Sequence, residues 1–160
     1  LATWESIEFR KHNRISVTPH LDSNLYADHG MQDTSIEYAI TSTGLGPAVV
    51  KDFAIYLENI RQKTYKAVWN KVTSQQDVNA EYLTMGSSTL EEGAFIVVGK
   101  KHRLFRMTIK NDSSKNAEKL PEHVTDHLRI EVCYCSVYGD NCQVVVVGNE
   151  QEEPVMQCIE

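Results

Sequence analysis

The sequence predicts a mainly β protein, an immunoglobulin-like antiparallel β-sandwich with two short inserted helices. Several segments alternate apolar and polar residues at period two, which is typical of half-buried strands. Short runs rich in glycine, asparagine and aspartate separate these segments. Three of the four cysteines lie within a single stretch, residues 128–147. Helical patterns are few and do not alternate with the strands, so a sandwich is favoured over a fold with a parallel sheet.

Residues 128–147, LRIEVCYCSVYGDNCQVVVV, are expected to form a β-hairpin. Alternate positions of the first half give one apolar face, which consists of Leu128, Ile130, Val132 and Tyr134. The intervening positions give the other face, which consists of Arg129, Glu131, Cys133 and Cys135. A two-residue turn is predicted at Tyr138-Gly139 or at Gly139-Asp140, because these residues tolerate positive φ.

The hairpin predicts a disulfide framework. Cys142 lies opposite Cys135 in the first register and diagonal to it in the second, so a bridge between them is within reach in both. Cys133 and Cys135 point the same way from one strand and are poor partners for each other. Cys133 is therefore left for Cys158, in the C-terminal tail. Four cysteines allow three pairings, and these two bridges are the expected set.

Length and composition predict one domain. Residues 14–160 are assigned to the sandwich and residues 1–13 to a stalk or edge segment. The net charge of −6 and the absence of a basic cluster argue against nucleic-acid binding. No apolar run is long enough to cross a bilayer. Because the chain starts at Leu1, we expect a fragment whose signal peptide or membrane anchor precedes it.

Further strands are expected at residues 14–21, 34–42, 48–57, 94–98 and 104–110, with the segment 94–98 well buried. Residues 20–33 and 111–119 read as polar loops, and residues 75–88 as irregular. Gly44-Leu45-Gly46-Pro47 is a tight connection in which the two glycines permit unusual φ. One helix is predicted where four apolar residues recur at helical spacing, namely Tyr65, Val68, Trp69 and Val72. A second short helix is expected to start at Pro121 and to reach about His127.

Two motifs resemble those of a group of uncharacterised bacterial proteins. They are TGLGPA at residues 43–48, closing a strand, and CYCSVYG at residues 133–139, followed by Cys142. Members of that group have one N-terminal transmembrane helix followed by an extracytoplasmic β-sandwich domain. They often carry a tryptophan directly after the third cysteine, where this chain has Gln143. The resemblance implies a periplasmic location, tethered to the inner membrane, and carries no activity with it.

The leading functional prediction is a non-enzymatic module that binds or scaffolds an unknown protein partner, without a cofactor. It would touch the membrane only through a segment upstream of Leu1. Four cysteines favour this oxidising location over a cytosolic protein with four free thiols. A second hypothesis is a structural subunit that self-associates through an exposed strand edge.

The enzyme alternative is a metal-dependent hydrolase built around His123 and His127, which share a helix face at i and i+4. Glu122 precedes the first histidine, so the His-Glu-x-x-His arrangement is absent. A third ligand would have to come from elsewhere, such as His102 or His20. The simpler interpretation is that His123 is exposed and His127 borders the core. No nucleophile elbow, phosphate loop or dinucleotide fingerprint occurs in the chain.

Overall fold

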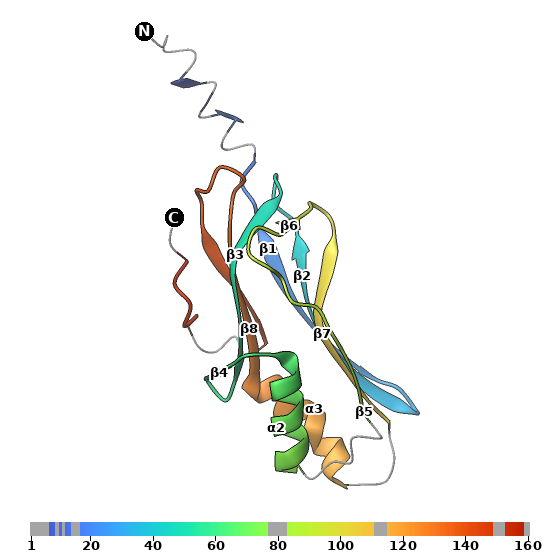
Figure 1. The fold of residues 1–160 in the computed structure, drawn as a ribbon. Helices are drawn as coiled ribbons and strands as arrows, with labels where there is room; N and C mark the ends of the chain where they lie inside the picture. The colour runs from blue at the N-terminus through green and yellow to red at the C-terminus, as the bar shows by residue number, and fades with distance from the viewer. Residues whose placement is uncertain are drawn as a thin grey trace.

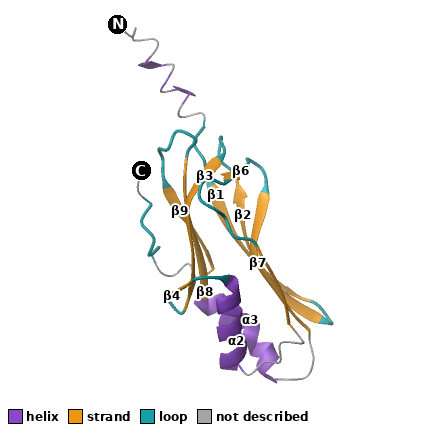
Figure 2. Ribbon diagram, viewed as in Figure 1, coloured by secondary structure: helices purple, strands orange, loops and turns teal. Residues whose placement is uncertain are grey.

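The computed structural model describes residues 7, 8, 10, 12, 13, 17–76, 83–110, 115–148 and 153–158. In these residues two antiparallel sheets pack together, and two helices lie at one end of them (Figures 1 and 2). The predicted mainly β sandwich with two inserted helices is confirmed. Most of the segment predicted as a stalk, residues 1–13, lies outside the described residues. Among the described residues, none of the helices has the length and hydropathy that a membrane span requires.

The first sheet has the order β1 (Leu21–His29), β2 (Asp33–Ser42), β7 (Lys101–Lys110) and β5 (Leu83–Ser87). The strands expected at 34–42 and 104–110 are present, whereas β1 occupies most of the loop expected at 20–33. Of the strand expected at 14–21, residues 17–20 are not in a strand and residues 14–16 lie outside the described residues. β1 pairs with β2 along its whole length, yet Leu21 is its one buried residue. A largely exposed edge strand lacks the alternation by which half-buried strands are recognised. β5 lies in a segment expected to be irregular, and Leu83 is the one buried residue among its five.

The second sheet has the order β4 (Ile60–Gln62), β3 (Ala48–Leu57), β8 (Leu128–Cys135) and β9 (Gln143–Gly148). A two-residue strand, β6 (Phe95–Ile96), also pairs with β3. The prediction of a well-buried strand at residues 94–98 is therefore wrong in both the length of the strand and its burial. Ile96 is buried, but its apolar neighbours Phe95, Val97 and Val98 are exposed, because the chain turns back at once into β7.

Helices α2 (Tyr65–Gln76) and α3 (Lys115–His127) close one end of the core (Figure 1). The ring of Tyr65 in α2 stacks on Phe105 of β7, with the ring centroids 5.5 Å apart. The hydroxyl of Tyr38 in β2 donates a hydrogen bond to the carbonyl oxygen of Val124 in α3, at 3.1 Å. These contacts fasten both helices to the first sheet.

Helix α3 begins earlier than the sequence predicts. Pro121 lies inside it instead of at its first turn, and the loop expected at 111–119 is helical from Lys115 onward. Proline lacks an N–H group and removes one hydrogen bond from a helix. Leu120, directly before it, is fully buried. Burial of that side chain stabilises the extra helical turn and offsets the lost hydrogen bond.

The connection from β2 to β3 lies against the segment that enters the sandwich. Neither Gly44 nor Gly46 has positive φ, so the expected reason for these glycines is wrong. A Cβ atom on Gly44 would lie 2.2 Å from the backbone nitrogen of His20, and one on Gly46 would lie 2.5 Å from the carbonyl oxygen of Val17. The N–H group of Leu45 donates to the carbonyl oxygen of Thr18 at 3.0 Å. Glycine is needed at both positions because any Cβ atom would collide with the backbone of residues 17–20.

Candidate functional site

Two disulfides lie on the outer face of β8. They join Cys133 to Cys158 and Cys135 to Cys142, which are the pairs expected from the sequence. No free cysteine occurs among the described residues. The two Cα atoms are 5.4 Å apart in the Cys133–Cys158 bridge and 4.0 Å apart in the Cys135–Cys142 bridge. Disulfides persist in oxidising compartments, so these bridges fit an extracytoplasmic environment.

The C-terminal tail, residues 153–158, is held on this face by a buried carboxylate as well as by Cys158. Glu131 of β8 accepts hydrogen bonds from the backbone N–H groups of Val155, at 3.0 Å, and Met156, at 2.7 Å. Met156 packs with Cys133 and with Tyr56 of β3 in a small apolar cluster. The tail thereby covers the outer face of the second sheet, which the alternation along β8 alone does not reveal.

The connection from β8 to β9 is a compact loop, residues 136–142. The hydroxyl of Ser136 donates to the carboxylate of Asp140 and accepts from the backbone N–H of Tyr138, at 3.1 Å. Backbone hydrogen bonds also run from Ser136 to Asp140, at 2.8 Å, and from Gly139 to Ser136, at 2.9 Å. The predicted two-residue turn is wrong because these bonds and the Cys135–Cys142 bridge close a longer loop. The first of the two predicted registers is present, with Tyr134 opposite Gln143.

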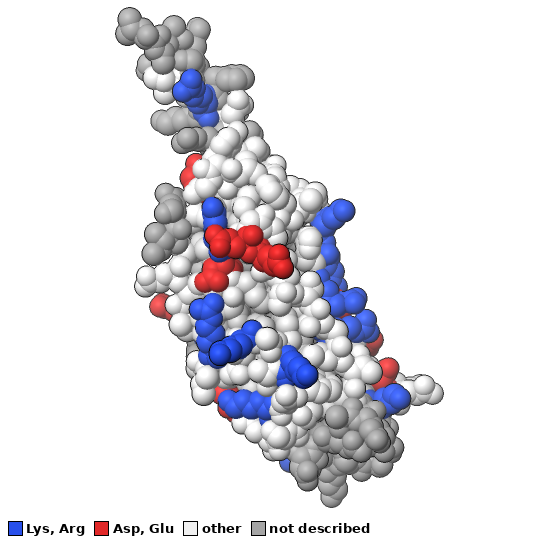
Figure 3. Space-filling view, viewed as in Figure 1, with Lys and Arg blue, Asp and Glu red and all other residues white. Residues whose placement is uncertain are grey.

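Three connections meet at the same end of the sandwich: β2 to β3, β6 to β7 and β8 to β9 (Figure 1). These connections and the strand β6 carry six large apolar side chains that are 41% to 74% exposed, which we call the loop-end surface: Leu45, Phe95, Val97, Val98, Val137 and Tyr138. Val49 of β3 pairs with both Phe95 and Cys135, so β6 and the disulfide loop flank the same strand. The face of this end that is visible in Figure 3 is mostly uncharged.

Sequence reasoning missed this surface because it assigned residues 94–98 to the core. An apolar run looks the same in a sequence whether it is buried or exposed. Contiguous exposed apolar side chains on a folded domain mark interaction sites more often than isolated ones do. The loop-end surface is therefore the strongest candidate site among the described residues.

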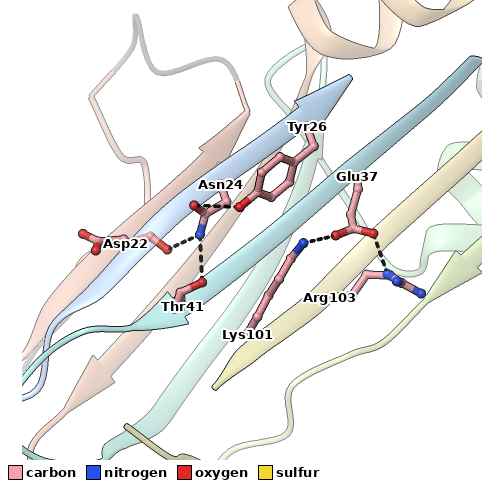
Figure 4. A network of polar contacts seen from close by, with 7 residues as sticks. All are labelled: Asp22, Asn24, Tyr26, Glu37, Thr41, Lys101 and Arg103. Carbon is pink, nitrogen blue, oxygen red and sulfur yellow. Dashed lines mark hydrogen bonds and ion pairs between the residues drawn. The ribbon is translucent and has the colours of Figure 1, made fainter. Parts of the chain in front are cut away.

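The outer face of the first sheet is polar and internally paired. Glu37 of β2 accepts from Lys101 and Arg103 of β7, at 2.5 Å and 2.8 Å (Figure 4). Burial acts to raise the pKa of Glu37, but the hydrogen bonds from these two cations hold it below its ordinary value. The ammonium group of Lys101 also lies 4.1 Å from the ring centroid of Tyr26. Because its charges are matched across the strands, this face is typical of a solvated surface.

A second group on this face joins β1 to β2 without any charged pair. The side-chain amide of Asn24 donates to the hydroxyl of Thr41, at 3.0 Å, and to the backbone carbonyl of Asp22, at 3.3 Å (Figure 4). The hydroxyl of Tyr26 donates to the side-chain oxygen of Asn24 at 3.3 Å. These bonds support the exposed edge strand β1.

The two histidines proposed as metal ligands stack on each other at the end of α3. Their ring centroids are 4.4 Å apart, and Nδ1 of His127 lies 2.8 Å from the carbonyl oxygen of His123. His123 is partly buried and His127 is exposed, the reverse of the expected arrangement. Burial, and then the neighbouring His127, lower the pKa of His123.

Neither His20 nor His102 joins this pair as a third ligand. Within the described ranges, one group of three side chains has metal-binding atoms close together, and it consists of Cys135, Cys142 and Cys158. All three sulfurs belong to disulfides. The geometry at His123 and His127 therefore gives the hydrolase hypothesis no support.

No protein-family model matches this chain, and no curated protein shows significant similarity to it. The fold and the site thus define its class by themselves. It is a disulfide-bridged antiparallel β-sandwich with an apolar end formed by three connections.

Proposed function

We propose that this protein is a non-enzymatic extracytoplasmic module, tethered to the inner membrane, that binds a protein partner through the loop-end surface. The observation that carries the proposal is the presence of six exposed apolar side chains on three connections and the short strand β6 at one end of the sandwich. Aromatic and aliphatic anchors of this kind supply most of the binding energy at protein interfaces. Tyr138 and Phe95 are the two aromatic members, at 57% and 62% exposure.

The backbone that carries these side chains is already ordered. The Cys135–Cys142 bridge closes the loop of Val137 and Tyr138. The turn of Val97 and Val98 is held to the end of β2 by a hydrogen bond from the N–H of Gly99 to the carbonyl of Ser42, at 2.8 Å. An ordered surface loses little conformational entropy on binding, which favours recognition by a protein partner.

The direction of the chain indicates where such a partner lies. Residues 17–20 run beside Gly44 and Gly46, so the N-terminal segment joins the sandwich at the loop-end surface. An anchor upstream of Leu1 would place this surface on the membrane side. The partner we propose is therefore the extracytoplasmic part of another inner-membrane protein. The disulfides support the extracytoplasmic location in this proposal. The resemblance of the two motifs, residues 43–48 and 133–139, supports the membrane anchor.

Site-specific photo-crosslinking in cells that express the full gene product tests the proposal. A photoreactive residue at Tyr138 should give a covalent adduct with one membrane protein. The matched control is the same residue at Ile60, which is 58% exposed on β4, away from the loop-end surface. A serine at Phe95 should weaken the adduct formed from position 138. Equal adducts at positions 60 and 138 would contradict the proposal.

The identity of the adduct separates the two binding hypotheses. An adduct between two copies of this chain would favour the self-associating subunit instead of a distinct partner. The tether is tested separately, by the coding sequence upstream of Leu1 and by fractionation of membranes from soluble protein. We expect an apolar segment of about 20 residues upstream, the length that spans a bilayer as a helix.

A further inference from the structure

The two disulfides lie next to each other on β8. The sulfur atoms of Cys135, Cys142 and Cys158 are all within 4.8 Å of one another. Cys158 is bonded to Cys133, so its sulfur faces both sulfurs of the neighbouring bridge while belonging to another. Its sulfur also lies 3.8 Å from the carbonyl oxygen of Tyr134, the residue that precedes Cys135. Thiol–disulfide exchange needs a thiolate close to a disulfide sulfur, and this spacing supplies it once Cys158 is free.

We infer that the two bridges form an exchange pair, in which reduction of Cys133–Cys158 lets Cys158 displace Cys142 from Cys135. The product is a Cys135–Cys158 bridge with free thiols at Cys133 and Cys142. The tail then remains joined to β8, two residues further along, while the loop 136–142 loses its covalent closure. The site therefore takes a protein dithiol as its co-reactant.

The first step is reduction by that external dithiol. Cys158 is partly exposed, whereas Cys133 is buried, so the incoming thiolate reaches the Cys158 sulfur. It forms a mixed disulfide with Cys158, and the Cys133 sulfur leaves and takes up a proton. The second thiol of the reductant then attacks the mixed disulfide. This releases the Cys158 thiolate and leaves the reductant as a disulfide, so two electrons have entered the protein.

The second step lies within the protein and consumes no electrons. The Cys158 thiolate attacks the Cys135 sulfur, the Cys135–Cys142 bond breaks, and the Cys142 thiolate leaves and is protonated. Cys142 is the leaving group because its sulfur is partly exposed, whereas Cys135 is fully buried in β8. Water stabilises the departing thiolate, and a better stabilised thiolate leaves faster.

A matched pair of variants isolates the second step. Cys133→Ser leaves Cys158 as a free thiol beside the intact bridge, and Cys158→Ser leaves Cys133 free. Pairings are read by acid quenching, alkylation and mass spectrometry of peptides. A pairing within about 1.4 kcal/mol of the parent one is populated to about a tenth or more. We expect the Cys135–Cys158 pairing to reach that fraction in Cys133→Ser, because the sulfur of Cys158 lies within 4.8 Å of both sulfurs of the intact bridge.

Cys158→Ser should retain only the Cys135–Cys142 bridge, because Cys133 is outside the sulfur cluster. Cys133→Ser with all of its Cys158 alkylated would overturn the inference, and a Cys142–Cys158 bridge would overturn the assigned leaving group.

Partial reduction of the parent protein does not depend on how a variant folds. A limiting amount of dithiol, followed by quenching, should yield Cys135–Cys158 as about a tenth or more of the species with one disulfide. If Cys135–Cys142 is the only such species, the exchange does not occur. The chemistry is independent of the proposed partner, since neither readout requires one.

Discussion

The carboxylate of Glu131 accepts the backbone N–H of Met156 at 2.7 Å, although the two residues are 25 positions apart. The other oxygen of the carboxylate lies 3.1 Å from Nε of Arg129, and the two side chains are 0% and 3% exposed. The guanidinium of Arg129 also lies 5.2 Å from the ring centroid of Tyr56. One buried charged pair therefore joins β8, β3 and the C-terminal tail.

Glu131→Gln should destabilise the protein strongly. The amide keeps the shape of the side chain but leaves Arg129 buried without its counter-charge, a loss of about 3–5 kcal/mol. The free energy of unfolding, from denaturant titration, measures it. The control Glu92→Gln, at an exposed position, should stay within about 0.5 kcal/mol of the parent. Adding Arg129→Met to Glu131→Gln should recover part of the loss, because the unpaired charge is removed while the amide oxygen still accepts from the backbone of the tail. A mild effect of Glu131→Gln alone would contradict this account.

Loss of the hydroxyl group should change the free energy of unfolding differently at two buried tyrosines. Tyr38→Phe removes the hydrogen bond to the carbonyl of Val124 and should cost about 1 kcal/mol. The hydroxyl of Tyr65 has no hydrogen-bond partner among the described residues. Tyr65→Phe should therefore leave the free energy of unfolding unchanged or raise it, because an unsatisfied buried hydroxyl is removed. Equal losses in the two variants, measured by denaturant titration at neutral pH, would refute the assignment.

Stability should fall in alkaline solution. Burial raises the pKa of Tyr38 and of Tyr65 above the ordinary value of about 10. Above that pH the unfolded chain loses these protons while the folded chain keeps them, so the unfolded state is favoured. The loss approaches about 1.4 kcal/mol per pH unit for each such tyrosine. In denaturant titrations above pH 10, the free energy of unfolding of Tyr65→Phe should fall less steeply with pH than that of the parent protein. Parallel curves for the two proteins would show that Tyr65 is not a cause of the decline.

Gly139→Ala should weaken the disulfide loop. Gly139 has a φ of 78°, and an added Cβ would meet no atom within 4 Å, so backbone strain alone is tested. The left-handed conformation costs a residue with a Cβ about 1–2 kcal/mol. Gly86→Ala in β5 is the matched control, since its added Cβ also meets open space and its φ is not positive. Thermal unfolding should show a loss for position 139 and none for position 86.

A thiol count on denatured, unreduced protein from its natural host tests the disulfides in their own compartment. We expect no free thiols before reduction and four after it, because the chain has four cysteines and the structure pairs all of them. Four free thiols before reduction would contradict the extracytoplasmic assignment as well as the bridges.

Several elements could be predicted because their signal is local. The helix α2 and most of the strand β2 bury one face, and burial of one face imposes a period on the sequence. All eight residues of β8 are buried, but its side chains still alternate in direction, so Cys133 and Cys135 lie on the same side. The disulfide pairs then follow from which sulfurs can reach each other.

Other features depend on segments that are distant in the chain. The edge strand β1 exists because β2 offers it a complete ladder, not because its own residues alternate. Phe95 is exposed because the chain turns back beside it into β7, which its apolar neighbours do not indicate. Helix α3 extends past Pro121 because Leu120 finds a buried position.

The sequence by itself thus determined a β-sandwich with one amphipathic helix and a pair of bridges beside a late hairpin, since periodicity and side-chain direction are properties of a single segment. Only the tertiary structure decided that six apolar side chains remain exposed at one end and that Glu131 binds the backbone of the tail. It also decided that the two bridges lie with their sulfurs within 4.8 Å. Those outcomes depend on which distant segments come together, and contact between such segments leaves no period in the sequence.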